Sequence, residues 1–487
     1  MSKPVLTALI IGAGFAGVCS AIKLRAAGID DFIIVEKTGG ISGTWFDNAY
    51  PGAACDVPSH LYSFSFAPNP NWSRKFSSAP EIRAYVEKTV EDFDIKKHIH
   101  HNTEITSARF DKTQGHWVVK SKTGEIFKAR FLMTSVAILG TPQMPDIAGI
   151  DTFTGTSFHT ARWPKALDIR GKKIAVIGSA ASALQIIPEI AKTAAKVCVF
   201  QRTANFVIPR HDRRYHKFEK LLFRIFPWTM KLPRFAIFAR SDYVFFHNFK
   251  SGSYINKKLT KHAHAYRNKT VSDPALNEVL TPNYTMGCKR VLLSDNYFQA
   301  LQQDNVDVIT TPIEKITPRG VATSNSNIDV DIIVYATGFK TSTYLPNLEI
   351  TGIHGATLAA WRKQPQALRG LVIDNMPNAF FLLGPNTNLG HSSMILMIEA
   401  QVKYMVQCVQ AVPTNTYFSV KADAVRIYNE DIQKHLAKSV WATGCVSWYK
   451  LPDGSIPTMW PHQTSTFTKM MRKFESAEYD FIKIDAP

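Results

Sequence analysis

Two segments of this 487-residue chain carry the pattern of a strand, a glycine-rich turn and a helix. In the first, residues 5–11 are aliphatic and rich in β-branched side chains, and Gly12, Gly14 and Gly17 follow with the spacing GxGxxG. A second segment, residues 172–187, repeats the pattern. Such a turn brings the N–H groups of a helix N-terminus against a pyrophosphate. Two units of this kind predict an α/β fold with two Rossmann-like, dinucleotide-binding domains.

The first turn is expected to bind a dinucleotide through its glycines and through Phe15, which lies within the turn. Residues 31–35 predict the next strand, and Glu36 ends it. A carboxylate at that position accepts hydrogen bonds from a ribose 2′-OH. FAD and NAD share these features, so this unit alone predicts a nucleotide without distinguishing the two.

The second turn is GSAASA, which places Gly178, Ala180, Ser182 and Ala183 at the expected cofactor-binding positions. Ala180 occupies the position of the middle glycine, where a Cβ atom limits how closely the backbone approaches a pyrophosphate. We therefore expect a binding site here with weakened affinity for its nucleotide.

The strand after the second turn, residues 197–200, is followed by Gln201, Arg202 and Thr203 rather than by an acid. An arginine fork binds a 2′-phosphate through paired, charge-assisted hydrogen bonds, whereas an acid would repel it. The expected cofactor at this turn is therefore NADPH rather than NADH. A solvated surface side chain is the plainer alternative for Arg202.

Between the two units lies FTGTSFHTARWP, residues 153–164. The spacing of Phe153, Gly155, His159 and Trp163 resembles the signature of the Baeyer–Villiger monooxygenases, flavoenzymes that insert one oxygen atom of O2 beside a ketone carbonyl. The same residues, with glycine before and Trp-Pro after, predict a short, ordered connector. Because histidines are more often hydrogen-bonded than catalytic, a structural linker is the alternative, and the two interpretations are compatible.

Residues 39–66 are rich in glycine, aromatic and turn residues and have no regular period, which predicts a loop kept ordered by buried aromatic rings. This stretch resembles the flavin-binding segment of the same family. The resemblance implies that Thr44, Trp45, Asp56 and Tyr62 contact the flavin nucleotide.

The resemblance continues in GCKR, where Arg290 matches the family's catalytic arginine and Lys289 matches the lysine that meets the 2′-phosphate. It implies that Asp56 orients Arg290 and stays charged beside it. It also implies backbone contact of Ile105 with the adenine side of FAD, and contact of Asn386 with the flavin ring. From the residues alone, plainer interpretations are open, since most loop aspartates form turns and most Lys-Arg pairs are solvated.

Residues 105–110, 116–121 and 128–135 predict the strands of a small antiparallel sheet, after which the chain crosses to the second domain near residues 134–142. The segment 211–277 lacks the βαβ pattern and has a helical, basic and aromatic composition, so we expect a helical insertion. The predicted parts are a FAD-binding domain at 1–142 and 336–487, an NADPH-binding domain at 143–210 and 278–335, and the insertion at 211–277.

The formal net charge is +18, from 57 Lys+Arg against 39 Asp+Glu. No metal-finger spacing, aromatic RNA-binding signature or block of basic residues accompanies this charge, so we expect no nucleic-acid partner. Two nucleotide cofactors would use only a few of the charges. The basic insertion makes peripheral membrane contact a weak further hypothesis, although aromatic helices more often form core or the wall of a substrate channel.

The six cysteines are scattered without a C-x-x-C pair, which argues against a zinc site, a disulfide framework and a dithiol redox centre. We expect no metal and, by default, a reduced cytoplasmic compartment. The first three residues leave no room for a secretory signal, and no run of about 18 apolar residues could span a membrane.

The resemblance covers nearly the whole chain. It implies a Baeyer–Villiger monooxygenase with FAD that uses NADPH and O2 to convert ketones into esters or lactones through a flavin peroxide, and that also oxidises sulfides. The nearest alternative is a flavin-containing monooxygenase acting on amine nitrogen or sulfide sulfur. A dithiol reductase would need the cysteine pair that is absent. A hypothesis from another class is a catalytically inactive nucleotide-sensing or membrane-docking protein.

Overall fold

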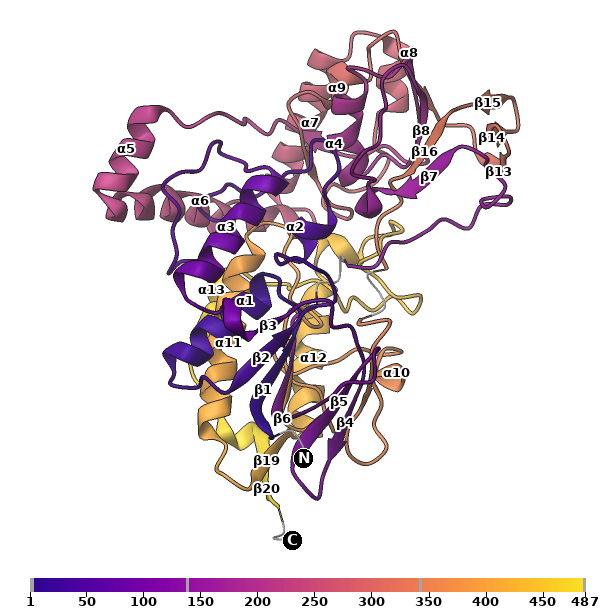
Figure 1. Cartoon of the computed structure of the whole chain (residues 1–487). Coiled ribbons are helices and arrows are strands. Elements are labelled where there is room, and N and C mark those ends of the chain that lie inside the picture. Colours follow the sequence, from indigo (N-terminus) through magenta and orange to yellow (C-terminus); the bar gives the residue numbers. More distant parts are fainter. Residues whose placement is uncertain (1–3, 137–139, 341–343, 485–487) are drawn as a thin grey trace.

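The computed structural model describes residues 4–136, 140–340 and 344–484 and contains two large sheets, one low and one high in Figure 1. The lower sheet has the strand order β17-β4-β5-β6-β1-β2-β3, and β18 also pairs with β6. Its strands are β1 (Leu6–Ile11), β2 (Phe32–Val35), β3 (Ile99–His100), β4 (Ile105–Asp111), β5 (His116–Ser121), β6 (Ile126–Thr134), β17 (Glu349–Thr351) and β18 (Ala379–Phe381).

The centre of the lower sheet is parallel, because β1 pairs in parallel with both β2 and β6. The pairs β4–β5 and β5–β6 are antiparallel, which forms the small antiparallel sheet predicted from the sequence. Both faces are covered, as expected for buried parallel strands. The helices α1 (Phe15–Ala26) and α11 (Met394–Ala411) pack on one face, and the rings of Trp117 and Phe381 lie in the core of the other.

The upper sheet is parallel throughout, in the order β12-β9-β8-β16-β7. One face is covered by α4 (Ala181–Ile190) and α9 (Tyr297–Ala300). Each large sheet contains a strand followed by a tight turn and a helix, β1 with α1 and β8 with α4, and the predicted α/β class with two Rossmann-like units is confirmed. The strands are β7 (Thr156–His159), β8 (Lys173–Ile177), β9 (Lys196–Phe200), β12 (Val306–Ile309) and β16 (Ile332–Tyr335).

The signature segment 153–164 is ordered, and part of it is the edge strand β7 of the upper sheet, paired with β16. A Cβ atom on Gly155 would lie 2.6 Å from the carbonyl oxygen of Asp331, so only glycine fits there. His159 is buried, accepts a hydrogen bond from the N–H of Ala161 at 3.1 Å, and packs edge-on against the ring of Phe339. Phe339 lies where the chain returns toward the lower sheet, so the signature braces that crossing. Part of the other crossing, residues 137–139, lies outside the described residues.

Phe153 and Trp163 are packing residues of the same segment. Phe153 contacts the core beneath β8 and β16, and Trp163 meets the ring of Phe158 edge-on with centroids 5.1 Å apart. None of the four signature side chains lines the cavity described below.

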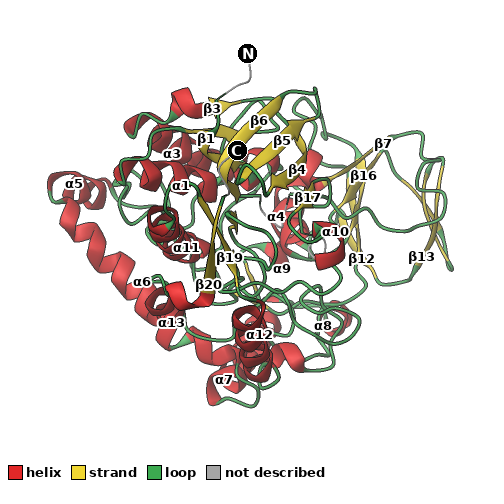
Figure 2. Cartoon of the chain, turned by 90° about the horizontal axis from the view of Figure 1, so that it is seen from below, coloured by secondary structure: helices red, strands yellow, loops and turns green. Residues whose placement is uncertain are grey.

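Helices fill the segment between β10 (Val207–Ile208) and β11 (Leu292–Leu293). In Figures 1 and 2, α5 and α6 lie along the outer edge of the molecule, and Figure 1 shows α7 and α8 in its upper part, where the upper sheet also lies. These helices are α5 (Lys217–Ile225), η3 (Pro227–Met230), α6 (Lys231–Tyr243), η4 (Phe245–Phe249), α7 (Tyr254–Thr270) and α8 (Pro274–Val279).

The remaining elements are short or belong to the C-terminal part. They are α2 (Thr44–Asp47), α3 (Ala79–Asp92), η1 (Lys96–His98), η2 (Thr160–Arg162), β13 (Ile313–Thr317), β14 (Gly320–Thr323), β15 (Asn327–Asp329), α10 (Leu358–Trp361), β19 (Thr416–Val420), α12 (Ala422–Leu436), η5 (Val440–Ala442), α13 (Thr464–Met470), η6 (Ser476–Glu478) and β20 (Tyr479–Lys483). Among the described helices, none is both long enough and apolar enough to cross a membrane.

One expectation about the cysteines is wrong. Cys288 and Cys445 form a disulfide across 157 residues of sequence, with Cα atoms 6.4 Å apart, within the usual range for such a bond. Spacing could not reveal this pair, because the fold brings two distant segments together. The remaining cysteines, Cys19, Cys55, Cys198 and Cys408, are buried thiols.

Candidate active site

A cavity of about 1800 Å3 lies between the two large sheets. It exceeds the volume of about 300–1,000 Å3 that is typical of small-molecule sites, so it has room for more than one large ligand. Of the residues predicted to bind cofactors, those that line it are Gly12, Gly14, Phe15, Glu36, Thr44, Trp45, Asp56, Tyr62, Ile105, Gly178, Ala180, Ser182, Arg202, Thr203, Lys289 and Arg290.

The first turn exposes bare backbone to the cavity. Gly12 has φ of +103°, and a Cβ atom on it would lie 3.1 Å from the carbonyl oxygen of Ser135. A Cβ atom on Gly17 would lie 1.9 Å from the carbonyl oxygen of Gly12, so Gly17 serves the packing of α1 and does not itself line the cavity. A Cβ atom on Gly43 would lie 3.2 Å from the Cα of Gly14. This geometry leaves the N-terminus of α1 accessible to a pyrophosphate.

Glu36 is buried at the end of β2 and keeps one hydrogen-bond site toward the cavity. Its Oε2 accepts a hydrogen bond from the N–H of Ala13 at 2.9 Å. Its Oε1 accepts from the N–H and the hydroxyl of Thr38, each at 2.9 Å. A carboxylate oxygen accepts two hydrogen bonds, so Oε2 can take one more donor. A ribose hydroxyl has the required chemistry.

An aromatic cluster stands beside the first turn. Trp45 Nε1–H donates to the hydroxyl oxygen of Tyr62 at 3.1 Å, and Tyr62 meets the ring of Phe15 edge-on with centroids 5.4 Å apart. Burial raises the pKa of the Tyr62 hydroxyl, which therefore stays protonated. Thr44, which begins α2, and Ile105, which begins β4, also line the cavity. The cluster orders the loop, as predicted, and offers flat apolar surface to a ring system.

The second turn repeats the geometry of the first at the end of β8. Gly178 has φ of +115°, and a Cβ atom on it would lie 2.5 Å from the carbonyl oxygen of Ala336. Ala180 precedes α4 with an ordinary φ of −85° and lines the cavity together with Ser182. Ala183 does not line the cavity, because it is fully buried in the core beneath α4. The predicted role of Ala183 is thus limited to packing.

Two cations converge at one corner of the cavity. Burial and then the positive charge of Arg202 lower the pKa of Lys289. The Lys289 ammonium lies over the ring of Tyr284, with Nζ 4.8 Å from the ring centroid. Thr203 lines the cavity at the same corner. Two positive charges at one corner attract an anion, so this corner fits a phosphate.

Arg290 and Asp56 form a hydrogen-bonded ion pair on the cavity wall. The Nε of Arg290 donates to Oδ2 of Asp56 at 3.1 Å, and Nη2 donates to the same oxygen. Burial raises the pKa of Asp56, but the charge and hydrogen bond of Arg290 and the charge of Arg210 outweigh burial, so the net pKa is lowered. The charge of Asp56 in turn raises the pKa of Arg290. Both side chains are therefore charged, and both are partly exposed to the cavity.

Arg210 is a site residue that the sequence did not indicate. It lines the cavity, and its Nη2 donates to the carbonyl of Cys55 at 2.6 Å, directly before Asp56. The carboxylate of Asp295 accepts the N–H groups of Arg210 and of the two residues after it at 2.8–2.9 Å. Arg210 lies just after the two-residue strand β10, at the start of the insertion. No sequence motif covers this position, so the sequence offered no reason to select it.

Tyr449 is a second unpredicted residue. It is buried and lines the cavity beside Trp448, and the positive charge of Arg290 opposes the effect of burial on the pKa of its hydroxyl. Burial raises the pKa of Tyr449 to about 12, so its hydroxyl is a neutral donor. Its position next to Trp448, in an aromatic C-terminal stretch, was the signal that could have indicated it. Trp460 from the same stretch is buried in the core instead.

Asn386 does not line the cavity, and its predicted contact with the flavin ring stays a prediction. It is 1% exposed with φ of +55°. Its Nδ2 donates to the carbonyls of Ile456 at 2.7 Å and Met459 at 3.0 Å. The side chain therefore fastens the C-terminal segment, while the nearby Gly384 and Thr387 face the cavity.

Two relatives align with almost the full chain. A protein named Baeyer-Villiger monooxygenase from Pseudomonas aeruginosa is 40% identical over 476 residues, which cover 96% of this chain and 90% of that protein. One with the same name from Streptomyces coelicolor is 39% identical over 493 residues, which cover 97% and 92%. The chain belongs to the Baeyer–Villiger monooxygenase family. A family model described as pyridine nucleotide-disulphide oxidoreductase also matches residues 9–216.

Solved structures of this family superpose on the whole molecule. OTEMO in complex with FAD and NADP has a TM-score of 0.88 at 26% identity, covering 99% of this chain and 100% of that one. Cyclohexanone monooxygenase from Rhodococcus sp. Phi1, bound to NADP+, has a TM-score of 0.88 at 25% identity with the same coverage.

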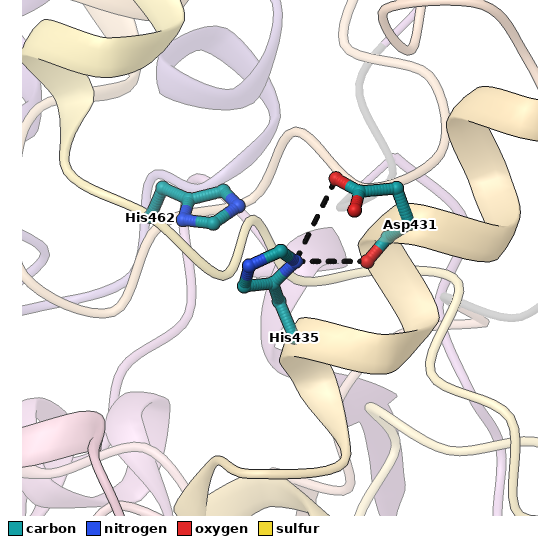
Figure 3. A group of neighbouring side chains, drawn as sticks. All are labelled: Asp431, His435 and His462. Carbon is teal, nitrogen blue, oxygen red and sulfur yellow. Dashed lines mark hydrogen bonds and ion pairs between the residues drawn. The ribbon is translucent and has the colours of Figure 1, made fainter.

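A group of potential metal ligands lies elsewhere in this Baeyer–Villiger monooxygenase. Asp431 and His435 of α12 and His462 have ligand atoms within 4.8 Å of one another, and none of them lines the cavity (Figure 3). Nδ1 of His435 donates to the Asp431 carbonyl at 2.9 Å and lies 3.6 Å from the Asp431 carboxylate. A nitrogen that carries a proton cannot ligate a metal, so this hydrogen bond leaves only Nε2 of His435 as a potential ligand atom. We assign no metal to this group, and a metal-free protein remains a prediction.

Proposed function

We propose that this chain is an NADPH-dependent flavin monooxygenase of the Baeyer–Villiger type, which uses O2 to convert ketones into esters or lactones. The observation that carries the proposal is the Asp56–Arg290 ion pair on the wall of one cavity that both dinucleotide-binding turns also line. Small-molecule ketones and O2 would be its partners.

The residues present fit both cofactors. The bare turn at Gly12 and Gly14, the free acceptor on Glu36 and the aromatic wall suit FAD. The turn at Gly178 and the Arg202–Lys289 corner suit NADPH, because paired cations match its 2′-phosphate. When bound, FAD reduced by NADPH would supply the activation of O2, one atom of which is transferred to the substrate while the other leaves as water.

The side chains of this chain would supply electrostatic stabilisation and positioning. Arg290 presents a fixed positive charge to the negative charge that develops during oxygen transfer, including the charge on the ketone oxygen. Asp56 and Arg210 hold that charge in place, so little reorganisation accompanies the reaction. The buried hydroxyl of Tyr449 adds a neutral donor.

Product analysis tests the proposal. Purified protein with FAD, NADPH and air would receive linear, cyclic and aryl ketones and one thioether, and the products would be identified by mass spectrometry. We expect esters or lactones heavier by one oxygen, and a sulfoxide from the thioether. Sulfoxide with every ketone unchanged would instead support the heteroatom monooxygenase. A protein that binds FAD but never consumes NADPH would support the inactive nucleotide-binding alternative.

The cytoplasmic location also remains a proposal. Because Cys288 and Cys445 are paired, cysteine usage no longer argues for a reducing compartment. Fractionation of cells that express the tagged chain would test the location directly.

A further inference from the structure

The insertion carries an apolar surface that no part of the described chain covers. It is formed by α5, η3 and α6, where large hydrophobic side chains are between 48% and 73% exposed. We call it the α5–α6 surface. Its members are Phe218, Leu221, Ile225, Phe226, Trp228, Leu232 and Phe235.

The spacing of these side chains separates an outer from an inner face. Phe218, Leu221 and Ile225 follow the i, i+3, i+7 pattern and share one side of α5. Phe223, on the other side of α5, is buried against the ring of His60 with centroids 4.9 Å apart. The inner side of α5 thus packs on the rest of the protein, whereas its outer side is exposed and available to a partner.

The helix α6 has the same two-sided character. Phe235 is 67% exposed on the outer face, whereas Ile237, Arg240 and Ser241 line the cavity. Arg234 is turned inward and donates to the carbonyls of His60 and Ser63, at 2.8 and 2.9 Å. The α5–α6 surface therefore lies on the outside of a wall whose inside is the candidate active site. Figures 1 and 2 show both helices at the edge of the molecule.

The charges around this surface have one sign. The segment 217–243 contains six Lys and Arg and two acids. Both acids are engaged within the protein: Glu219 pairs with Arg213 and caps α5, and Asp242 is fully buried and accepts the N–H of Thr464. The exposed cations Lys217, Arg224 and Lys231 therefore border the apolar side chains without exposed acids on these helices.

We propose that the α5–α6 surface docks on an anionic lipid membrane. An amphipathic helix pair with an apolar face and a basic border binds in the interface of a bilayer, because apolar burial and attraction to anionic headgroups act together. A second copy of this chain would bring the same cations together, since a two-fold interface is self-complementary, and like charges would repel. The net charge of +18 adds a long-range attraction to an anionic surface.

Vesicle co-sedimentation tests the proposal with the full-length holoprotein. Vesicles of phosphatidylcholine alone and of phosphatidylcholine with phosphatidylglycerol would be compared at low and at physiological salt. We expect binding to the anionic vesicles at least tenfold tighter than to the neutral ones. The variant with Phe218→Glu and Phe235→Glu should lose at least tenfold in this affinity and keep its thermal unfolding temperature, because both side chains are largely exposed.

A matched control is the variant with Ile427→Glu and Phe481→Glu, which removes two exposed apolar side chains elsewhere. This control should bind anionic vesicles like the parent. The proposal would be overturned if the two double variants bound anionic vesicles with equal affinity, or if the parent did not bind them. Sedimentation velocity without lipid provides a further check: a parent dimer that Phe218→Glu and Phe235→Glu convert to monomer would assign the surface to a second copy instead.

Discussion

Arg290 directs both Nε and Nη2 at a single oxygen, Oδ2 of Asp56, across 234 residues of sequence. This arrangement fixes the orientation of the guanidinium while leaving its remaining N–H groups available to the cavity. Because each charge stabilises the other, the pair stays ionised over the physiological pH range.

Replacing Arg290 by Ala should abolish ester formation while FAD stays bound. The loss removes the positive charge that opposes negative charge developing during oxygen transfer, and a decrease in kcat of roughly 100- to 1,000-fold or more is expected. Initial rates from mass spectrometry and flavin absorbance per chain would measure the two effects. Arg170→Ala, which breaks an exposed arginine–aspartate pair, should leave both unchanged. Ester formation by Arg290→Ala at the parent rate would refute the assigned role.

Replacing Asp56 by Asn should lower kcat about 10- to 100-fold, because the arginine loses its charged anchor. The KM for NADPH should change little, since the hydrogen bonds of Asp56 go to Arg290 and not to Arg202 or Lys289. In the parent, protonation of Asp56 should not limit activity until the pH falls below the ordinary carboxyl value of 3.8. Steady-state kinetics against pH would show both effects, and unchanged kcat in Asp56→Asn would exclude a positioning role.

Removing the cations at the second turn should change the preference between nicotinamide cofactors. The double variant Arg202→Ala with Lys289→Ala should raise the KM for NADPH about 10- to 100-fold, because charge-assisted hydrogen bonds to the 2′-phosphate are lost. The KM for NADH should stay nearly constant. Lys192→Ala, on the surface of the same domain, serves as control. An equal effect on both cofactors would contradict the phosphate assignment.

His60 should make the protein less stable at acid pH. Burial lowers its pKa from 6.5 to about 4, so the folded state binds its proton less readily than the unfolded state. The free energy of unfolding is unaffected by this histidine above pH 6.5. It falls as the pH drops toward 4, by about 3 kcal/mol in total, because the unfolded state then binds the proton more tightly than the folded state. Urea unfolding of the parent and of His60→Phe across this range would measure the difference. His101→Gln, at an exposed site, should retain the parent pH dependence.

The disulfide between Cys288 and Cys445 should hold the loop that carries Lys289 and Arg290. Reduction with dithiothreitol should lower the free energy of unfolding by about 2–4 kcal/mol and raise the KM for NADPH. Cys445→Ser should show the same losses and no further response to dithiothreitol. If dithiothreitol changes neither the free energy of unfolding nor the KM for NADPH of the parent protein, this prediction is contradicted.

Local motifs accounted for much of the fold. Short sequence patterns predicted the glycines of both turns, the end of β2 at Glu36 and the antiparallel strands. Each of these features depends on backbone geometry within a few residues. Packing residues were harder to separate from binding residues. Gly17, Ala183 and Asn386 stand within or near the motifs, yet none of them lines the cavity, since a motif specifies a turn and not which of its atoms face the ligand.

The sequence by itself determined the two nucleotide-binding units, the connector between them and the family, because these are encoded in contiguous segments. Only the tertiary structure decided which distant groups meet. Arg210 beside Asp56, Tyr449 beside Arg290, and Cys288 bonded to Cys445 are juxtapositions across long stretches of chain. They arise from how the two sheets, the insertion and the C-terminal segment pack, and that packing has no signature in any single stretch of residues.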